Sequence, residues 1–185
     1  MSRIQKVELE KATGTQKEIL ESIKKKIGKV PNIYAGLAQS PAALQGYLSF
    51  GDHLQKGLLD AKTRETIALA VAQYNECNYC LSAHSFIGSK MLGMTEEEIV
   101  DIRNGHATDL KIQALLDFVL KVVDQRGKIT EADYQKIRNA GYSEGEIVEI
   151  IASIGQTIFT NYFNHVAQTE IDFPVVGALD LKNVA

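Results

Sequence analysis

The sequence is short of several features that would assign it to a class at once. Its 185 residues include no tryptophan, three prolines and two cysteines. Two cysteines are too few for the disulfide framework of a small secreted domain, so they indicate redox or metal chemistry instead. No apolar stretch approaches the roughly 20 residues of a membrane-spanning helix, and residues 1–6 lack the apolar segment of a secretory signal. We therefore expect a cytoplasmic protein without a membrane partner.

An excess of charge of either sign is absent as well. The 20 Lys and Arg residues nearly balance the 23 Asp and Glu residues, for a net charge of −3. This balance does not favour binding to nucleic acid or to an anionic membrane. Hydrophobic residues make up 45% of the chain and charged residues 23%, as in an ordinary globular protein. The length predicts one domain over residues 1–185 with a sizeable core.

Hydrophobic periodicity and capping residues predict helices along almost the whole chain. No stretch shows the alternating pattern of a strand. The helices are expected at about 15–27, from 31, at 41–55, 61–73 and 77–92, from 95, and at 110–125, 130–139 and 144–167. Residues 175–185 have no helical period and are expected to form an extended tail. The predicted fold is therefore all-α, an orthogonal or up-and-down bundle of about eight helices.

Both cysteines lie in one stretch of the chain. Cys77 and Cys80 are three positions apart, and His84 follows four positions later. On a helix that begins at Cys77 the three side chains share one face, and the two sulfurs can join without rearrangement of the backbone. Asn75 is the expected N-cap of this helix, whose N-terminal N–H groups favour thiolate over thiol. The pattern therefore predicts a nucleophilic thiol, a second thiol that resolves it, and a base.

Glu65 is the candidate partner of the base. It opens the apolar run of the preceding helix and shares a face with Leu69 and Ala72, so we expect it to point inward. A carboxylate beside His84 orients the imidazole and raises its basicity, so that the ring can accept a thiol proton. This contact requires the two helices to fold back on each other.

Other interpretations of the Cys-x-x-Cys pair remain open on the residues alone. The two thiols could be buried small hydrophobic side chains. Together with His84 and Glu65 they could supply four zinc ligands, although structural zinc sites seldom use a carboxylate and no second ligand pair occurs. Thioredoxin-like chemistry uses the same motif, but in a βαβ setting that a helical chain lacks.

The spacing of these residues resembles a known signature. It matches the pattern of the alkylhydroperoxidase D-like branch of the carboxymuconolactone decarboxylase family. In that pattern a glutamate (Glu65) is followed by eleven residues, a Cys-x-x-Cys pair (Cys77 and Cys80), three residues and a histidine (His84). Other segments of the chain are also similar to that family, at 30–34, 40–44, 58–65, 161–165 and 172–174. The resemblance extends over about residues 28–175. The chain departs from the family at Tyr79, where some members carry a histidine between the cysteines.

The resemblance implies an alkylhydroperoxidase D-like fold and a thiol-dependent peroxidase, or thiol–disulfide oxidoreductase, without metal or bound organic cofactor. It casts Cys80 as the thiolate that becomes a sulfenic acid and Cys77 as the proton donor that resolves it. The opposite assignment stays open, because Cys77 lies nearer to the helix N-terminus. The implied partners are a hydroperoxide and a thiol reductant of the dihydrolipoamide or thioredoxin type. A lactone decarboxylase and a redox-sensing module without turnover are the alternatives.

The resemblance also implies a homo-oligomer, a trimer or a pair of trimers. The sequence adds its own reason, because the chain offers more apolar helical faces than one small bundle readily covers. In the last helix the isoleucines are expected to fill the core of the subunit, namely Ile147, Ile150, Ile151, Ile154 and Ile158. A polar seam with aromatic neighbours is expected to meet another subunit, namely Gln156, Thr160 and Asn164 beside Tyr162 and Phe163.

Overall fold

The computed structural model describes residues 2–179, and all regular secondary structure in this range is helical. The described residues form nine helices: α1 (Gly14–Ile27), α2 (Asn32–Leu37), α3 (Pro41–Leu54), α4 (Ala61–Tyr74), α5 (Asn78–Met91), α6 (Glu96–Arg103), α7 (Leu110–Asp124), α8 (Glu131–Asn139) and α9 (Glu144–Ala167). The all-α prediction is therefore confirmed, and each segment expected to be helical is a helix. Where the sequence predicts both ends of a helix, the observed ends differ by no more than one residue.

Side chains that bind the free N–H groups of the first turn set the start of most helices. Six caps each accept a hydrogen bond through a side-chain oxygen from the N–H three residues further on: Ser40, Asp60, Asp109, Thr95, Thr130 and Ser143. In the last three, the carboxylate at that third position accepts a hydrogen bond from the cap's own N–H. Each such cap stabilises its helix by about 1 kcal/mol. Helix starts are therefore local properties of this sequence.

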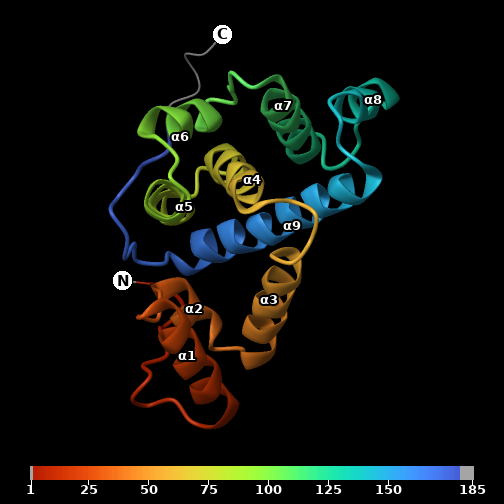
Figure 1. Ribbon diagram of the computed structural model, residues 1–185. Helices are drawn as coiled ribbons and strands as arrows, with labels where there is room; N and C mark the ends of the chain where they lie inside the picture. Colours follow the sequence, from red (N-terminus) through yellow and green to blue (C-terminus); the bar gives the residue numbers. More distant parts are fainter. Residues whose placement is uncertain (1, 180–185) are drawn as a thin grey trace.

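Helix α4 lies at the centre of the molecule and packs against α5, α6, α7 and α9 (Figure 1). Every residue from 65 to 73 is buried, so α4 is covered on all its faces. A helix in this position needs small or apolar side chains all round, which the run of Ala, Leu, Ile and Val after Glu65 provides. The same burial carries the carboxylate of Glu65 into the protein interior.

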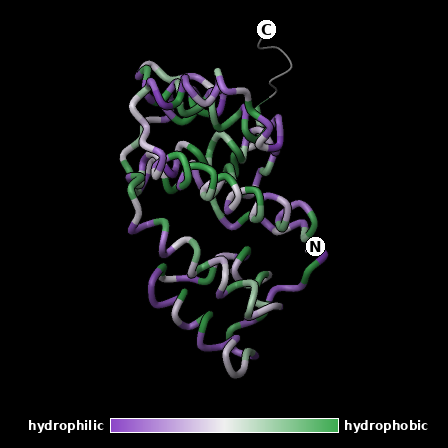
Figure 2. Tube along the Cα trace, turned by 90° about the vertical axis from the view of Figure 1, so that its right-hand side faces the viewer, coloured by the Kyte–Doolittle hydropathy of each residue, from purple (hydrophilic) through white to green (hydrophobic). Residues whose placement is uncertain are grey.

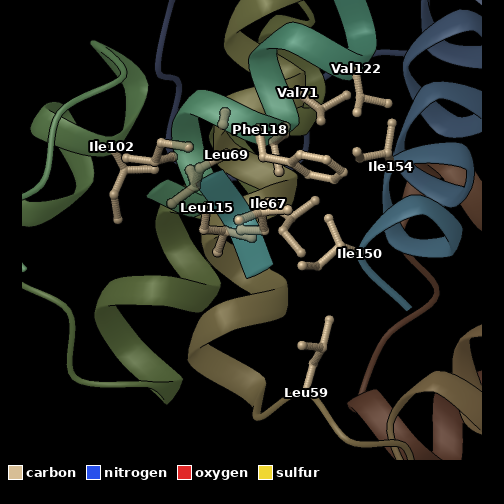
Figure 3. Close-up of a cluster of buried hydrophobic side chains, with 14 of the residues drawn as sticks. Leu59, Ile67, Leu69, Val71, Ile102, Leu115, Phe118, Val122, Ile150 and Ile154 are labelled. Atoms are coloured by element: carbon tan, nitrogen blue, oxygen red, sulfur yellow. The ribbon is translucent and has the colours of Figure 1, made fainter. Parts of the chain in front are cut away.

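The buried side chains form two clusters. The distal cluster joins α4, α6, α7 and α9 and includes Ile67, Leu115, Phe118 and Ile150 (Figure 3). The cysteine cluster joins α1, α2, α3 and the start of α5 and includes both cysteines with Tyr79, Leu20 and Leu44. Hydrophobic and hydrophilic residues alternate along much of the chain, as helices with one apolar face require (Figure 2). Full burial of one large apolar side chain contributes about 1.5–3 kcal/mol to folding.

Helix α9 differs in part from its predicted role. It crosses the molecule between α1–α3 and the other helices (Figure 1), and its isoleucines at 147, 150 and 154 are buried as predicted. Ile151 is instead 50% exposed, and Ile158 is only partly buried. The prediction for the polar seam is wrong for Thr160 and Asn164, which are buried inside the subunit, whereas Gln156 is partly exposed. Asn164 donates to Cys80 at the start of α5, and the Gln156 side chain donates to the carbonyl of Tyr47 on α3.

The C-terminal segment, residues 168–179, contains no helix and runs beside α5. The Ser82 hydroxyl accepts a hydrogen bond from the Val176 N–H at 2.9 Å, and the Asn78 side chain accepts one from the Ala178 N–H at 2.9 Å. The prediction of a non-helical tail is confirmed for residues 175–179, and residues 180–185 lie outside the described range. Among the described helices none is both long enough and apolar enough to span a membrane.

Candidate active site

The turn between α4 and α5 places the first cysteine. Asn75 still belongs to the end of α4, where its N–H donates to the carbonyl of Val71 at 3.0 Å. Glu76 then takes a left-handed conformation with φ of 53°, which reverses the chain direction. Cys77 is the N-cap of α5, and its sulfur accepts the N–H of Cys80 at 3.4 Å. The prediction of Asn75 as the cap is therefore wrong, and the cysteine sulfur itself takes that place.

The two cysteines are close enough to form a disulfide. Their Cα atoms are 5.3 Å apart and their sulfurs lie at disulfide distance, inside the roughly 4.4–6.8 Å range of Cα separations that disulfides require. Both residues are buried, at 1% and 3% exposure for Cys77 and Cys80. The predicted proximity of the two thiols is confirmed, and the pair belongs to the cysteine cluster rather than to the protein surface.

Glu65 and His84 form a contact between α4 and α5. The Nδ1 atom of His84 lies 2.8 Å from Oε1 of Glu65, and their side chains are 25% and 11% exposed. Burial lowers the pKa of His84, but the negative charge of Glu65 and the hydrogen bond raise it by more, so the pKa lies above its ordinary value. Because Nδ1 faces the carboxylate, Nε2 is the ring nitrogen left to accept a proton. The predicted inward orientation of Glu65 is confirmed.

Asn164 contacts the site although its sequence position does not predict this. Its Nδ2 donates a hydrogen bond to the sulfur of Cys80 at 3.2 Å, across 84 positions of the chain. Its Oδ1 is buried and has no hydrogen-bond partner among residues 2–179. One turn earlier on α9, Asn161 accepts a bond from the side chain of Asn75 at 2.9 Å. The sequence signals were polar residues at helical spacing and the family resemblance of residues 161–165, and neither reveals the partner.

Tyr79, between the two cysteines, is tied to the surrounding backbone. Its hydroxyl donates to Oδ1 of Asp172 at 2.8 Å and accepts the N–H of Ile33 at 3.2 Å. Asp172 also pairs with Lys29 at 3.2 Å. Burial and the nearby carboxylate raise the pKa of Tyr79 well above its ordinary value, so the phenol stays neutral. The side chain thus joins α2, α5 and the C-terminal segment.

A cleft of about 230 Å³ opens beside Cys77, between the start of α5 and the end of α9. Its walls include Cys77, Asn78, Asn164 and His165. His165 is held there by a contact of 2.7 Å between its Nε2 and the carbonyl of Asn75. Of the two cysteines, Cys77 lines this cleft and Cys80 does not.

A larger hollow of about 440 Å³ lies elsewhere, between α4, α6 and α7. Arg103, Asp117 and Lys121 line it, and none of the predicted site residues does. Among residues 2–179, no three His, Cys, Asp or Glu side chains lie where they could hold one metal ion together. The candidate site therefore consists of the cysteine pair, the Glu65–His84 pair and the smaller cleft.

Comparisons with known proteins agree with this geometry. Residues 41–125, which contain all four predicted site residues, match the model of the carboxymuconolactone decarboxylase family. A structure from Ralstonia eutropha JMP134, described as an alkylhydroperoxidase AhpD core and an uncharacterized peroxidase-related protein, shares the fold with a TM-score of 0.79. It is 25% identical, and the match covers 92% of each chain.

Two further relatives extend the comparison. An uncharacterized peroxidase-related protein from Silicibacter sp. TM1040 has a TM-score of 0.73 and 26% identity, over 91% of this chain and 92% of its own. An uncharacterized protein of Haemophilus influenzae is 43% identical over 70 residues. That alignment spans 37% of this chain and 57% of the Haemophilus protein, little more than half of the relative's length.

Proposed function

Because the chain belongs to the carboxymuconolactone decarboxylase family, in its alkylhydroperoxidase D-like branch, we propose that it is a thiol-dependent peroxidase. The family and the cysteine pair at disulfide distance support a peroxidase-related redox role. The observation that carries the finer proposal is that this pair shares helix α5 with a histidine bonded to a buried carboxylate. A redox pair and a proton acceptor are the two groups that peroxide reduction by a thiol requires.

The first half of the reaction oxidises the protein. His84, oriented by Glu65, accepts the proton of the Cys80 thiol at Nε2. The thiolate attacks one oxygen of the hydroperoxide, the O–O bond breaks, and the leaving oxygen takes a proton to become an alcohol or water. Cys80 is left as a sulfenic acid. The Cys77 thiol then attacks that sulfur, and water leaves as the disulfide forms.

The second half restores the two thiols. A thiol reductant of the dihydrolipoamide or thioredoxin type exchanges with the disulfide and is itself oxidised. The cleft beside Cys77 has room for the end of such a reductant. The proposed assembly is a trimer or a pair of trimers, in which the exposed face of α9 with Ile151 and Tyr162, rather than the polar seam, is available for contact.

A lactone decarboxylase is the less favoured alternative, since that chemistry has no use for two thiols at disulfide distance. A redox sensor without turnover would use the same pair. Only measurement of repeated turnover separates a sensor from a peroxidase.

The test is consumption of hydrogen peroxide and of an organic hydroperoxide with dihydrolipoamide as reductant. We expect turnover in the wild type and a loss of at least about a thousandfold in Cys80→Ser, because a hydroxyl cannot form the sulfenic acid. In Cys77→Ser, one equivalent of peroxide should leave a sulfenic acid on Cys80 that mass spectrometry detects after trapping with dimedone. His84→Gln should slow turnover because it removes the proposed base. His53→Gln, at an exposed histidine of α3, is its matched control and should leave turnover unchanged. Disulfide formation without turnover would support the sensor instead.

A further inference from the structure

The sulfur of Cys80 receives a hydrogen bond from another helix. The donor is Nδ2 of Asn164, 3.2 Å away and on α9. Asn164 is 5% exposed, and its Oδ1 has no partner among the described residues. Burial of an amide with one end unpaired destabilises a protein by about 1–3 kcal/mol. Because an unpaired buried amide lowers stability, its position next to a reacting atom requires a chemical explanation.

The charge state of the sulfur supplies one. A sulfur atom in a disulfide or a thiol is a weak acceptor, whereas hydrogen bonds to ionised groups are roughly twice as strong as those between neutral groups. The contact between Asn164 and Cys80 therefore strengthens when the sulfur becomes negative. Cys77 has a different donor, since its sulfur accepts the backbone N–H of Cys80 at 3.4 Å. The side-chain amide thus distinguishes the two cysteines.

We infer that Asn164 is a further catalytic residue, whose amide N–H stabilises the Cys80 sulfur as an anion both when that sulfur attacks peroxide and when it leaves the disulfide. This inference rests on the proposed function for its catalytic meaning. The other titratable groups of the site are His84 on α5, Glu65 on α4 and His165 on α9, and none of them donates a hydrogen bond to the Cys80 sulfur.

The same contact sets the direction of disulfide reduction. Exchange is faster when the departing sulfur is the more stable thiolate, so Cys80 leaves and the incoming thiolate attacks Cys77. In that step a bond forms between the reductant sulfur and Cys77, the Cys77–Cys80 bond breaks, and Cys80 takes the electron pair. The second thiolate of a dithiol reductant then displaces Cys77, which takes a proton from solvent. The reductant ends as a disulfide, and the cleft on the Cys77 side is the matching route of approach.

Titration of a single thiol tests the inference without any peroxide. In a Cys77→Ser background only Cys80 titrates, and its thiolate is followed by ultraviolet absorbance. We expect Asn164→Ala to raise the pKa of the Cys80 thiol by about 1, the lower end of what a hydrogen bond to a charged group contributes. At a pH below the Cys80 pKa of both proteins, the fraction of thiolate and the rate of its alkylation should be about tenfold lower in Asn164→Ala. Asn164→Asp keeps the shape but replaces the donor by a carboxylate, and should raise the pKa further.

The matched control is Asn161→Ala, in the same background. Asn161 is an equally buried asparagine one turn away on α9, but its partner is Asn75 and not a sulfur. We expect it to lower the melting temperature without a change in the Cys80 pKa. The inference is overturned if the Cys80 pKa of both Asn164 variants equals that of the Cys77→Ser protein. It is also overturned if Asn161→Ala raises the Cys80 pKa as much as Asn164→Ala does.

A second measurement uses the wild-type protein and needs no variant. The oxidised protein is treated briefly with 2-mercaptoethanol, quenched in acid, alkylated with iodoacetamide and mapped by tandem mass spectrometry. We expect the small thiol on Cys77 and the alkyl group on Cys80, and the reverse pattern would overturn the assignment. A wild type without peroxide turnover, but with this titration and this pattern, would remove the proposed function and leave the role of Asn164 intact.

Discussion

The distal cluster buries aliphatic and aromatic side chains, including Met94 and Tyr142, whereas the cysteine cluster buries both cysteines and Tyr79 and has asparagine amides at its edge. In the distal cluster the apolar faces of α6, α7 and α9 pack against α4, which is buried all round. Next to the cysteine cluster, polar atoms of Asn161 and Asn164 lack partners among residues 2–179. The difference indicates that the first region provides stability and that the second gives up some stability for reactive groups.

The largest expected change is a loss of stability on substitution in the distal cluster. Phe118→Ala removes a side chain that is 4% exposed and packed among α4, α7 and α9, so we expect a loss of about 3–5 kcal/mol in the free energy of unfolding. The peroxidase rate per folded molecule should be nearly unchanged. Chemical denaturation followed by circular dichroism and peroxide consumption below the transition measure the two quantities.

Phe50→Ala is the control for that variant, because Phe50 is 43% exposed. It should change stability by no more than about 0.5 kcal/mol. A large fall in the peroxidase rate per folded molecule of Phe118→Ala would contradict this separation. It would show that packing in the distal cluster affects the reactive groups of the cysteine cluster.

Glu65→Gln sharpens the comparison from the side of the active site. The variant removes the charge that raises the pKa of His84 and leaves the burial that lowers it, so the pKa should fall. A neutral His84 is the base, and the rising limb of kcat/KM against pH should therefore move to lower pH. The plateau should drop about a hundredfold, because the weaker base is less well oriented. A pH–rate profile that matches the wild type would contradict the proposed relay.

The same variant has a consequence for stability that depends on pH. The pKa of His84 is higher in the folded protein than in the unfolded chain. This difference contributes its full stabilisation at pH values below the pKa of the unfolded chain. The stabilisation is lost as the pH rises through the pKa of the folded protein. The stability difference between wild type and Glu65→Gln should therefore be larger near about pH 6 than near about pH 9. Glu18→Gln, at an exposed carboxylate of α1, should show no such trend.

The smallest effect is expected for Tyr79→Phe. It removes a hydroxyl that bonds to Asp172 and to the N–H of Ile33, and should lower the free energy of unfolding by about 1–2 kcal/mol. Turnover should change little, since the hydroxyl faces α2 and the C-terminal segment. Tyr142→Phe is the matched control, as this buried tyrosine of the distal cluster has no hydroxyl hydrogen bond with the described residues. Equal stability losses in the two variants, measured by urea denaturation, would contradict the assigned role of Tyr79.

Most of the helices, and the spacing inside the candidate site, were determined by the sequence itself. Caps such as Asp60 and Ser143 act on N–H groups three residues away, and the distance from Cys77 to Cys80 depends on one helical turn. Such interactions lie within a few positions of each other, so a pattern in the chain is enough to predict them. The helix face of Glu65 and the resemblance to a family both predicted that it belongs to the same site, and the structure places it against His84.

Only the tertiary structure decided which face of α9 is internal and which residue donates to Cys80. The polar seam of α9 has the same pattern whether it meets another subunit or α5, and its burial depends on helices far away in the chain. Asn75 likewise fits the pattern of an N-cap, but in the structure it is the C-cap of α4, and its side chain donates a hydrogen bond to Asn161 of α9. Contacts between distant segments depend on how whole helices dock, and local periodicity carries no information about that choice.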